Sequence, residues 1–254
     1  MKITQFKGSM ENINVFKPVC GFLVNKVLKG SKIRVRMIDS ENGSTVEVIP
    51  SLPIEMLMEF STYGEGSFLT LKDNANQYLS GFIKISDDAV ALSNSRYLSV
   101  DITQPKADGA MTELYGFEST DVPVNFFYRY NSLYVGAGEL TKSFQKGDHE
   151  VLAIPIHLDS LGEAQLDEVQ LYTKTGTSPV YTIEELRFMA LQNNDIVKVH
   201  FEGSGSTISD GSSAQWCIID LEDVVGFDIK LKTNPKGMNI VLVDSKDVKE
   251  IKTA

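Results

Sequence analysis

Short stretches in which apolar and polar residues alternate, separated by turn residues, run along the whole chain. Alternation with period two is typical of β-strands buried on one face. Gly, Asn, Asp and Pro separate these stretches, and Asn42-Gly43 is the strongest hairpin signal among them. We predict strands near residues 19–24, 32–38, 45–49, 68–71, 81–86, 97–102, 124–130, 133–135, 150–158, 169–173, 196–201, 215–219, 227–232 and 239–243. So many short strands favour a β-sandwich or barrel over alternating βαβ units.

Helix signals are few and short. Residues 182–191 open with Thr182, which can cap a helix, and carry acids in the first turn, where they suit the helix dipole. Residues 53–60 open with Pro53, which is tolerated at a first helical position. The predicted fold class is therefore all-β with a few short helices.

The stretch 168–189 reads as a strand, a turn and a short amphipathic segment, and a looser version of it lies at 33–60. Ile54-Glu55 and Ile183-Glu184 are 129 positions apart. Residues 97–102 and 226–231 are related by the same offset. This repetition predicts two copies of one β domain. The alternative is one large sandwich with accidental similarity, because alternating patterns match one another easily.

The composition changes around residues 104–121, which is the best place for a domain boundary. We therefore predict a first β-sandwich over 1–110 and a second over 120–254. Residues 203–213, rich in Gly and Ser, are predicted to be a flexible loop between two strands.

Charge and cysteine content exclude several classes of protein. The formal net charge is −10, and such a surface repels a phosphate backbone, so we expect no direct binding of nucleic acid. Cys20 and Cys217, the only two cysteines, lie in apolar strand-like runs and are predicted to be buried free thiols. No run approaches the roughly 18 apolar residues of a membrane span, and the N-terminus does not resemble a signal peptide. We expect a protein that is made and folded in a cytosol.

The sequence contains none of the signatures of a nucleotide-binding loop, a nucleophile elbow or a zinc-binding helix. The residues that could carry chemistry are three histidines and three acidic groups: His149, His157, His200, Glu184/Glu185, Asp87/Asp88 and Asp220/Glu222/Asp223. A carboxylate pair for glycoside hydrolysis and a calcium site both stay open, but solvated surface is the favoured interpretation. We predict no catalytic, cofactor-binding or metal-binding residue.

Aromatic residues cluster at 125–130 and at Tyr134. Alternation sends Phe126, Tyr128 and Tyr130 to one face and their neighbours to the other, as in a strand buried on both sides. This pattern favours a core or a subunit interface over a sugar-binding platform.

The order of segments in the second half resembles a known family. Residues 151–158, 166–172 and 183–188 give strand, strand, turn at Gly176 and short helix, while 221–231 and 238–243 resemble closing strands. This order and the chain length resemble the double jelly-roll major capsid proteins of tailless, membrane-containing bacteriophages, with the PM2-like corticoviruses nearest in size. The first half fits less well, and its residues 77–97 have no clear counterpart.

The resemblance implies two tandem jelly rolls in a self-assembling major capsid protein without catalysis or cofactor. It also implies pseudo-hexagonal homotrimers in an icosahedral shell, synthesis in the host cytoplasm, and minor capsid or membrane proteins as partners on the inner side of the virion. Two other functions stay open: a phage tail, baseplate or spike β domain, and a carbohydrate-binding module or glycan-active β-sandwich enzyme.

Overall fold

The computed structural model describes residues 1–62, 71–73, 78–105, 111–118, 122–156, 163–193, 198–202, 205–209 and 216–247. The chain divides into two compact units. The first unit comprises Met1–Arg129, Asp195–Gly211 and Ser245–Ala254, and the second comprises Tyr130–Asn194 and Ser212–Asp244.

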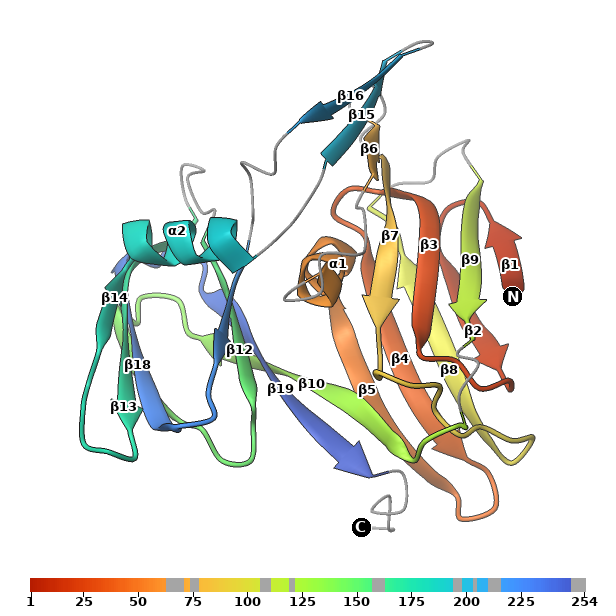
Figure 1. Cartoon of the computed structure of the whole chain (residues 1–254), viewed down its shortest axis with the longest axis horizontal. Helices are drawn as coiled ribbons and strands as arrows, with labels where there is room; N and C mark the ends of the chain where they lie inside the picture. The colour runs from red at the N-terminus through yellow and green to blue at the C-terminus, as the bar shows by residue number, and fades with distance from the viewer. Residues whose placement is uncertain are drawn as a thin grey trace. The chain divides into compact units, whose positions relative to one another are not determined.

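The first unit contains two sheets (Figure 1). The larger has seven strands in the order β1 (Lys2–Phe6), β9 (Thr112–Phe117), β3 (Gly21–Leu28), β7 (Tyr78–Lys84), β6 (Leu71–Asp73), β15 (Lys198–Glu202) and β16 (Gly205–Ser209). The smaller has the order β2 (Met10–Val15), β8 (Arg96–Thr103), β4 (Lys32–Asp39) and β5 (Ser44–Pro53). The described strand pairs of this unit are antiparallel, except that β6 and β15 pair in parallel.

The second unit contains two four-stranded sheets. One has the order β10 (Phe126–Val135), β19 (Met238–Asp247), β12 (Val151–Pro155) and β17 (Trp216–Asp220). The other has the order β11 (Thr141–Gln145), β18 (Val224–Thr233), β13 (Gln165–Thr173) and β14 (Val180–Thr182). Strand β10 begins in the first unit and ends in the second, and β19 runs the opposite way between them.

Both units have the same strand order. If β6, β15 and β16 are set aside, the described residues of each unit form eight strands, which read 1-8-3-6 in one sheet and 2-7-4-5 in the other. This is the jelly-roll arrangement of two Greek keys. The chain is therefore an all-β protein of two tandem jelly rolls, as predicted, and the two topologies agree strand for strand.

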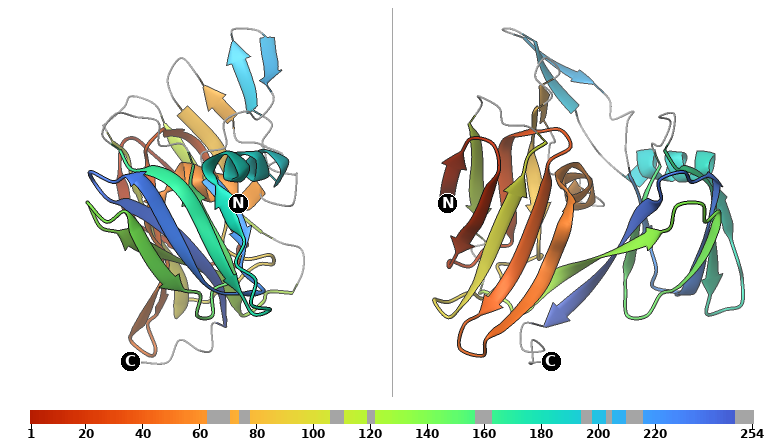
Figure 2. Two further views of the ribbon diagram at one scale, coloured as in Figure 1. Left: turned by 90° about the vertical axis from the view of Figure 1, so that its left-hand side faces the viewer. Right: turned by 180° about the vertical axis from the view of Figure 1, so that it is seen from behind.

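A short helix occupies the same place in each jelly roll. Helix α1 (Ile54–Thr62) follows the fifth strand of the first unit, and α2 (Ile183–Asn193) follows the fifth strand of the second. Each packs against the sixth strand of its own unit, β7 or β17 (Figure 2). Neither described helix, of nine or eleven residues, is long and apolar enough to span a membrane.

The core of each unit lies between its two sheets. In the second unit, Leu152 and Leu242 of one sheet and Val169 and Phe227 of the other belong to one buried apolar cluster. Along β13, Val169 lies between the polar residues Glu168 and Gln170, which is the pattern of a sheet buried on one face. In β12 and β19, Leu152 and Leu242 instead lie between apolar neighbours. In β13 and β18 the alternation that predicted the strands also builds the core.

Two predictions about organisation differ from the structure. Residues 104–121, expected as a domain boundary, contain β9, which pairs with β1 and β3 inside the first unit. The ranges 1–110 and 120–254 differ from the two compact units accordingly. Within residues 203–213, expected as a loop, Gly205–Ser209 form β16, because their backbone pairs with β15. The strand predicted at 68–71 lies mostly outside the described residues.

Candidate functional site

The outward face of the seven-stranded sheet carries an apolar patch. Strand register places Leu23 of β3 opposite both Tyr115 of β9 and Phe82 of β7, and Gly21 opposite Phe117. Their neighbours Phe22, Val24 and Leu114 are buried in the core, so these four side chains point away from it. We call Leu23, Phe82, Tyr115 and Phe117 the outer patch.

The outer patch is partly exposed. Leu23 has 40% and Phe117 has 49% of its surface accessible, whereas Phe82 has only 4%. The rings of Phe82 and Phe117 meet edge to face with centroids 5.4 Å apart. Exposed apolar clusters of this kind are typical of interaction surfaces.

A hydrogen-bonded polar group borders the outer patch. Glu113 of β9 accepts bonds from Lys2 Nζ at 2.7 Å, from the Tyr115 hydroxyl at 3.0 Å and from Asn25 Nδ2 at 3.1 Å. These bonds lower the pKa of the Glu113 carboxyl to about 2, and the bond from Lys2 has the largest effect. The same bond to Glu113 raises the pKa of Lys2, so both groups stay charged and neutralise each other near neutral pH.

The corresponding strands of the second unit present a different face. There Val241 of β19, Ala153 of β12 and Ile218 of β17 lie side by side on the strand faces that point away from the core. All three are at most 1% exposed. The same row of three strands is therefore a buried apolar layer in the second unit and a partly exposed one in the first.

The outward faces of the other two sheets are polar. In the first unit Arg36 of β4 is paired with Asp101 of β8 at 2.8 Å, and Arg34 with Glu47. In the second unit Lys230 of β18 is paired with Glu168 of β13. These ion pairs make the outward faces of the two sheets hydrophilic.

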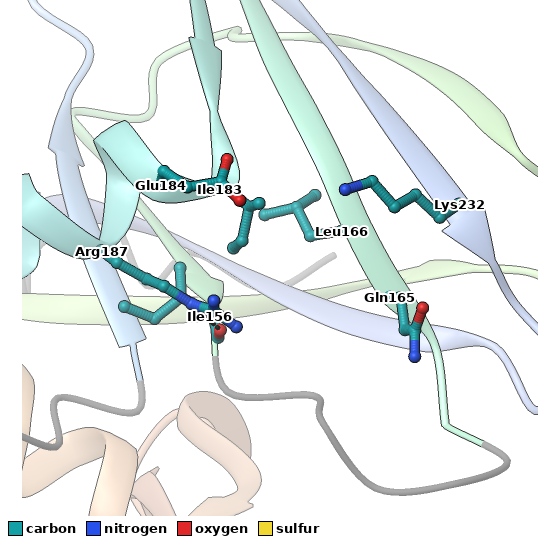
Figure 3. Close-up of a pocket in the computed structure, with 7 residues that line it drawn as sticks. All are labelled: Ile156, Gln165, Leu166, Ile183, Glu184, Arg187 and Lys232. Carbon is teal, nitrogen blue, oxygen red and sulfur yellow. Dashed lines mark hydrogen bonds between the residues drawn. The ribbon is translucent and has the colours of Figure 1, made fainter.

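A small hollow lies at one end of the second unit (Figure 3). Ile156, Leu166 and Ile183 form its apolar part, and Gln165, Glu184, Arg187 and Lys232 complete it. Arg187 Nε donates to the Ile156 carbonyl at 3.3 Å, and Lys232 is paired with Asp167 at 3.5 Å. The hollow measures about 150 Å³, below the ~300 Å³ at which small-molecule sites begin, and its polar groups do not converge (Figure 3).

The acidic groups singled out in the sequence have structural partners. Glu185 accepts bonds from the backbone N and the hydroxyl of Thr182, which lower the pKa of its carboxyl and cap α2. Asp87 accepts from the Tyr128 hydroxyl at 2.6 Å and is paired with Lys84. Asp220 accepts from the backbone N of Glu222 and so shapes the turn before β18.

The histidines lie apart in the chain. His149 shares hydrogen bonds with the Lys146 carbonyl at 2.7 Å and with the Asn131 amide at 3.1 Å. His200 belongs to β15, and His157 lies outside the described residues. Among the residues that the structure describes, no group of three or more His, Cys, Asp or Glu is placed to hold a metal ion.

The aromatic cluster of β10 differs from the prediction that its residues alternate between two buried faces. Phe126 is 55% exposed, whereas Phe127 and Tyr130 are buried. Phe127 and Tyr130 are three positions apart, so they lie on opposite faces of the strand. The buried face therefore changes between them, where the strand passes from one unit to the other. Since Tyr130 is only 1% exposed, the tyrosines do not form an open platform for sugars.

Cys20 and Cys217 are buried free thiols, as predicted.

Sequence reasoning did not find the outer patch. Leu23 lies in the continuous apolar run 19–24, where no alternation separates inward from outward positions. Phe117 lies in the segment interpreted as a domain boundary. Only the strand register brings the two residues onto one face.

The fold and its surfaces define a double jelly-roll protein. No family model matches the chain, and no curated protein matches it. Among solved structures it is similar to the major capsid protein P2 from bacteriophage PM2, with 10% identity, a TM-score of 0.53 and coverage of 97% of each chain. It is also similar to the STIV MCP, with 10% identity, a TM-score of 0.49 and coverage of 96% of this chain and 92% of the other. The likeness to the PM2 protein shows a shared fold over nearly the whole length of both chains.

Proposed function

We propose that the chain is a structural protein of a virion, a major capsid protein that assembles with copies of itself. The observation that carries the proposal is the tandem jelly roll, which matches over 97% of both chains a protein described as a major capsid protein. A partial match could reflect a common module grafted onto many functions. A match over both units and their connections is more specific.

The tandem architecture supports a trimer as the assembly unit. Two jelly rolls of the same topology in one chain mean that three chains around a threefold axis present six similar units. Such a trimer can occupy a hexagonal position in an icosahedral shell. The proposal includes minor capsid or membrane proteins on the inner side and synthesis in the host cytoplasm, and it assigns the chain neither catalysis nor a cofactor.

Oligomeric mass is the most direct test of this function. Size-exclusion chromatography with light scattering should give three times the chain mass of 28.1 kDa, and negative-stain imaging should show trimers or sheets. Addition of calcium or of a chelator in the same runs tests whether assembly depends on calcium. A protein that stays monomeric at high concentration would contradict a capsid role. Retention on immobilised glycans would instead favour the carbohydrate-binding alternative.

A further inference from the structure

The turn between β4 and β5 contains the one Asn-Gly pair of the sequence, Asn42-Gly43 (Figure 1). We infer that Asn42 is a site of spontaneous deamidation and that the Asp39 carboxylate controls the rate of this reaction. The inference concerns a covalent modification of the β4–β5 hairpin and does not depend on the proposed capsid role.

The reaction consumes only water and releases ammonia. The electron pair of the Gly43 backbone nitrogen forms a bond to Asn42 Cγ, the Cγ–Nδ2 bond breaks, and the proton of the attacking nitrogen leaves with the amide as ammonia. Water then opens the resulting succinimide ring at either of its carbonyl groups, which gives aspartate or isoaspartate at position 42. Because the attacking nitrogen must lose its proton, the rate rises with pH.

The turn leaves both reacting groups accessible. Asn42 and Gly43 are exposed. Gly43 has a φ of +64°, which glycine adopts without steric cost. Apart from its two neighbours in the chain, no atom of the described residues lies within 4 Å of the place that a Cβ atom would take at Gly43. The side-chain amide of Asn42 can therefore approach the next backbone nitrogen without obstruction.

A hydrogen bond to Asp39 opposes this approach. Asn42 Nδ2 donates to Asp39 Oδ2 at 3.0 Å, and the Arg96 guanidinium donates to the same oxygen at 3.0 Å. Asp39 Oδ1 accepts from the backbone N of Glu41 at 3.1 Å and of Asn42 at 3.2 Å. These bonds lower the pKa of the Asp39 carboxyl, and the bond from the Asn42 backbone has the largest effect, so the acceptor is charged at neutral pH. The Asn42 amide must leave this charged acceptor before its Cγ can reach the attacking nitrogen.

Asp39 is a fixed acceptor, and the reaction would turn it against the turn that it now holds. Its exposure is 3%, and Arg96, which anchors it, belongs to the neighbouring strand β8. Deamidation replaces the donating amide of Asn42 with a carboxylate beside that of Asp39, and the two like charges repel. Isoaspartate also lengthens the backbone of the turn by one carbon atom. The modification therefore loosens the end of the β4–β5 hairpin.

Asp39→Asn tests the role of the carboxylate because it separates its two oxygens. The remaining side-chain oxygen can still accept from the backbone of the turn, whereas an NH2 group replaces the oxygen that holds Asn42 Nδ2 and Arg96. Glu47→Gln is the matched control, because it removes a carboxylate from the same hairpin that is paired with Arg34 instead of the turn. Peptide mass spectrometry after incubation at mildly basic pH measures conversion at Asn42, in native buffer and in denaturant. Circular dichroism confirms that each variant is folded.

We expect folded Asp39→Asn to deamidate at Asn42 about tenfold faster than the wild type, because a bond to a charged acceptor is lost. The two proteins should react alike in denaturant, and Glu47→Gln should follow the wild type in both conditions. If Asp39→Asn does not fold, Asp39→Ser takes its place, since its hydroxyl can accept from the turn but is too short to reach Asn42 Nδ2. The inference is overturned if the folded Asp39 variants react at Asn42 at the wild-type rate. It is equally overturned if they keep this amide intact while the denatured chain loses it.

Discussion

The rings of Phe82 and Phe117 meet edge to face across Gly21, with centroids 5.4 Å apart and planes inclined by 73°. Gly21 makes this possible because it has no side chain. A Cβ atom at Gly21 would collide with Phe82 Cζ and with the Ile83 carbonyl oxygen. The contact in the outer patch thus depends on a glycine in the strand between the two rings.

Replacing Gly21 with alanine should therefore destabilise the protein. The added methyl group meets a backbone atom that cannot move aside, so we expect a loss of ~1–3 kcal/mol in the free energy of unfolding, measured by urea titration. Gly136→Ala is the control, because its Cβ would meet only the flexible end of Glu139 at 3.1 Å. An equal loss in the two variants would show that the close approach at Gly21 does not matter.

Glu113 should make stability depend on pH in the acid range. The pKa of the Glu113 carboxyl is about 2 in the folded protein, below its ordinary value of 4.5. The hydrogen bonds that Glu113 accepts therefore stabilise the fold fully above about pH 4.5, and this stabilisation is lost as the pH falls from about 4.5 to about 2. Glu113→Gln should melt below the wild type near neutral pH, and the difference should vanish in strong acid. Thermal melts over a pH series measure this effect, with the exposed Glu11→Gln as the control. A difference that stays constant with pH would contradict the assignment.

The internal repeat was predictable because it follows the spacing of apolar residues. Ile54 and Ile183 are the first residues of α1 and α2, and both are buried. Residues 97–102 and 226–231 both lie in seventh strands, β8 and β18. At these places a strong alternating or amphipathic pattern coincides with the elements that form the core, so local sequence and tertiary structure agree.

Other strands carry too little apolar signal to be predicted. Strand β11 reads Thr-Lys-Ser-Phe-Gln, with one large apolar residue, and it lies at the edge of its sheet. Strand β9 has Gly116 at an inward position, where a Cβ would lie 2.7 Å from Val19 Cγ1. At Gly116 the strand backbone packs closely against Val19, and there is no inward apolar side chain. The alternation of apolar and polar residues is therefore lost in β9. The outer patch combines residues of β9 with Leu23 from the continuous apolar run 19–24, so no local sequence pattern predicts it.

The cap of α2 is a further point at which one substitution has a defined effect. Thr182 Oγ1 accepts from the backbone N of Glu185 at 3.3 Å, and the Glu185 carboxylate accepts from the backbone N of Thr182 at 2.8 Å. Thr182→Ala should lower the free energy of unfolding by ~1 kcal/mol, whereas Thr182→Ser should retain most of it. Chemical denaturation measures both variants. If serine were as destabilising as alanine, the hydroxyl would not be the stabilising group.

Cys217 should be nearly inert while the protein is folded. Burial raises the pKa of its thiol to about 12, well above its ordinary value. The thiolate is the reactive form, so alkylation at mildly basic pH should be much slower, by about a hundredfold or more, than for an exposed cysteine. Timed labelling with iodoacetamide followed by peptide mass spectrometry measures the rate at Cys217, and the same protein in denaturant supplies the unprotected rate. Rapid labelling of a protein that retains its native circular dichroism would show that β17 opens locally without global unfolding.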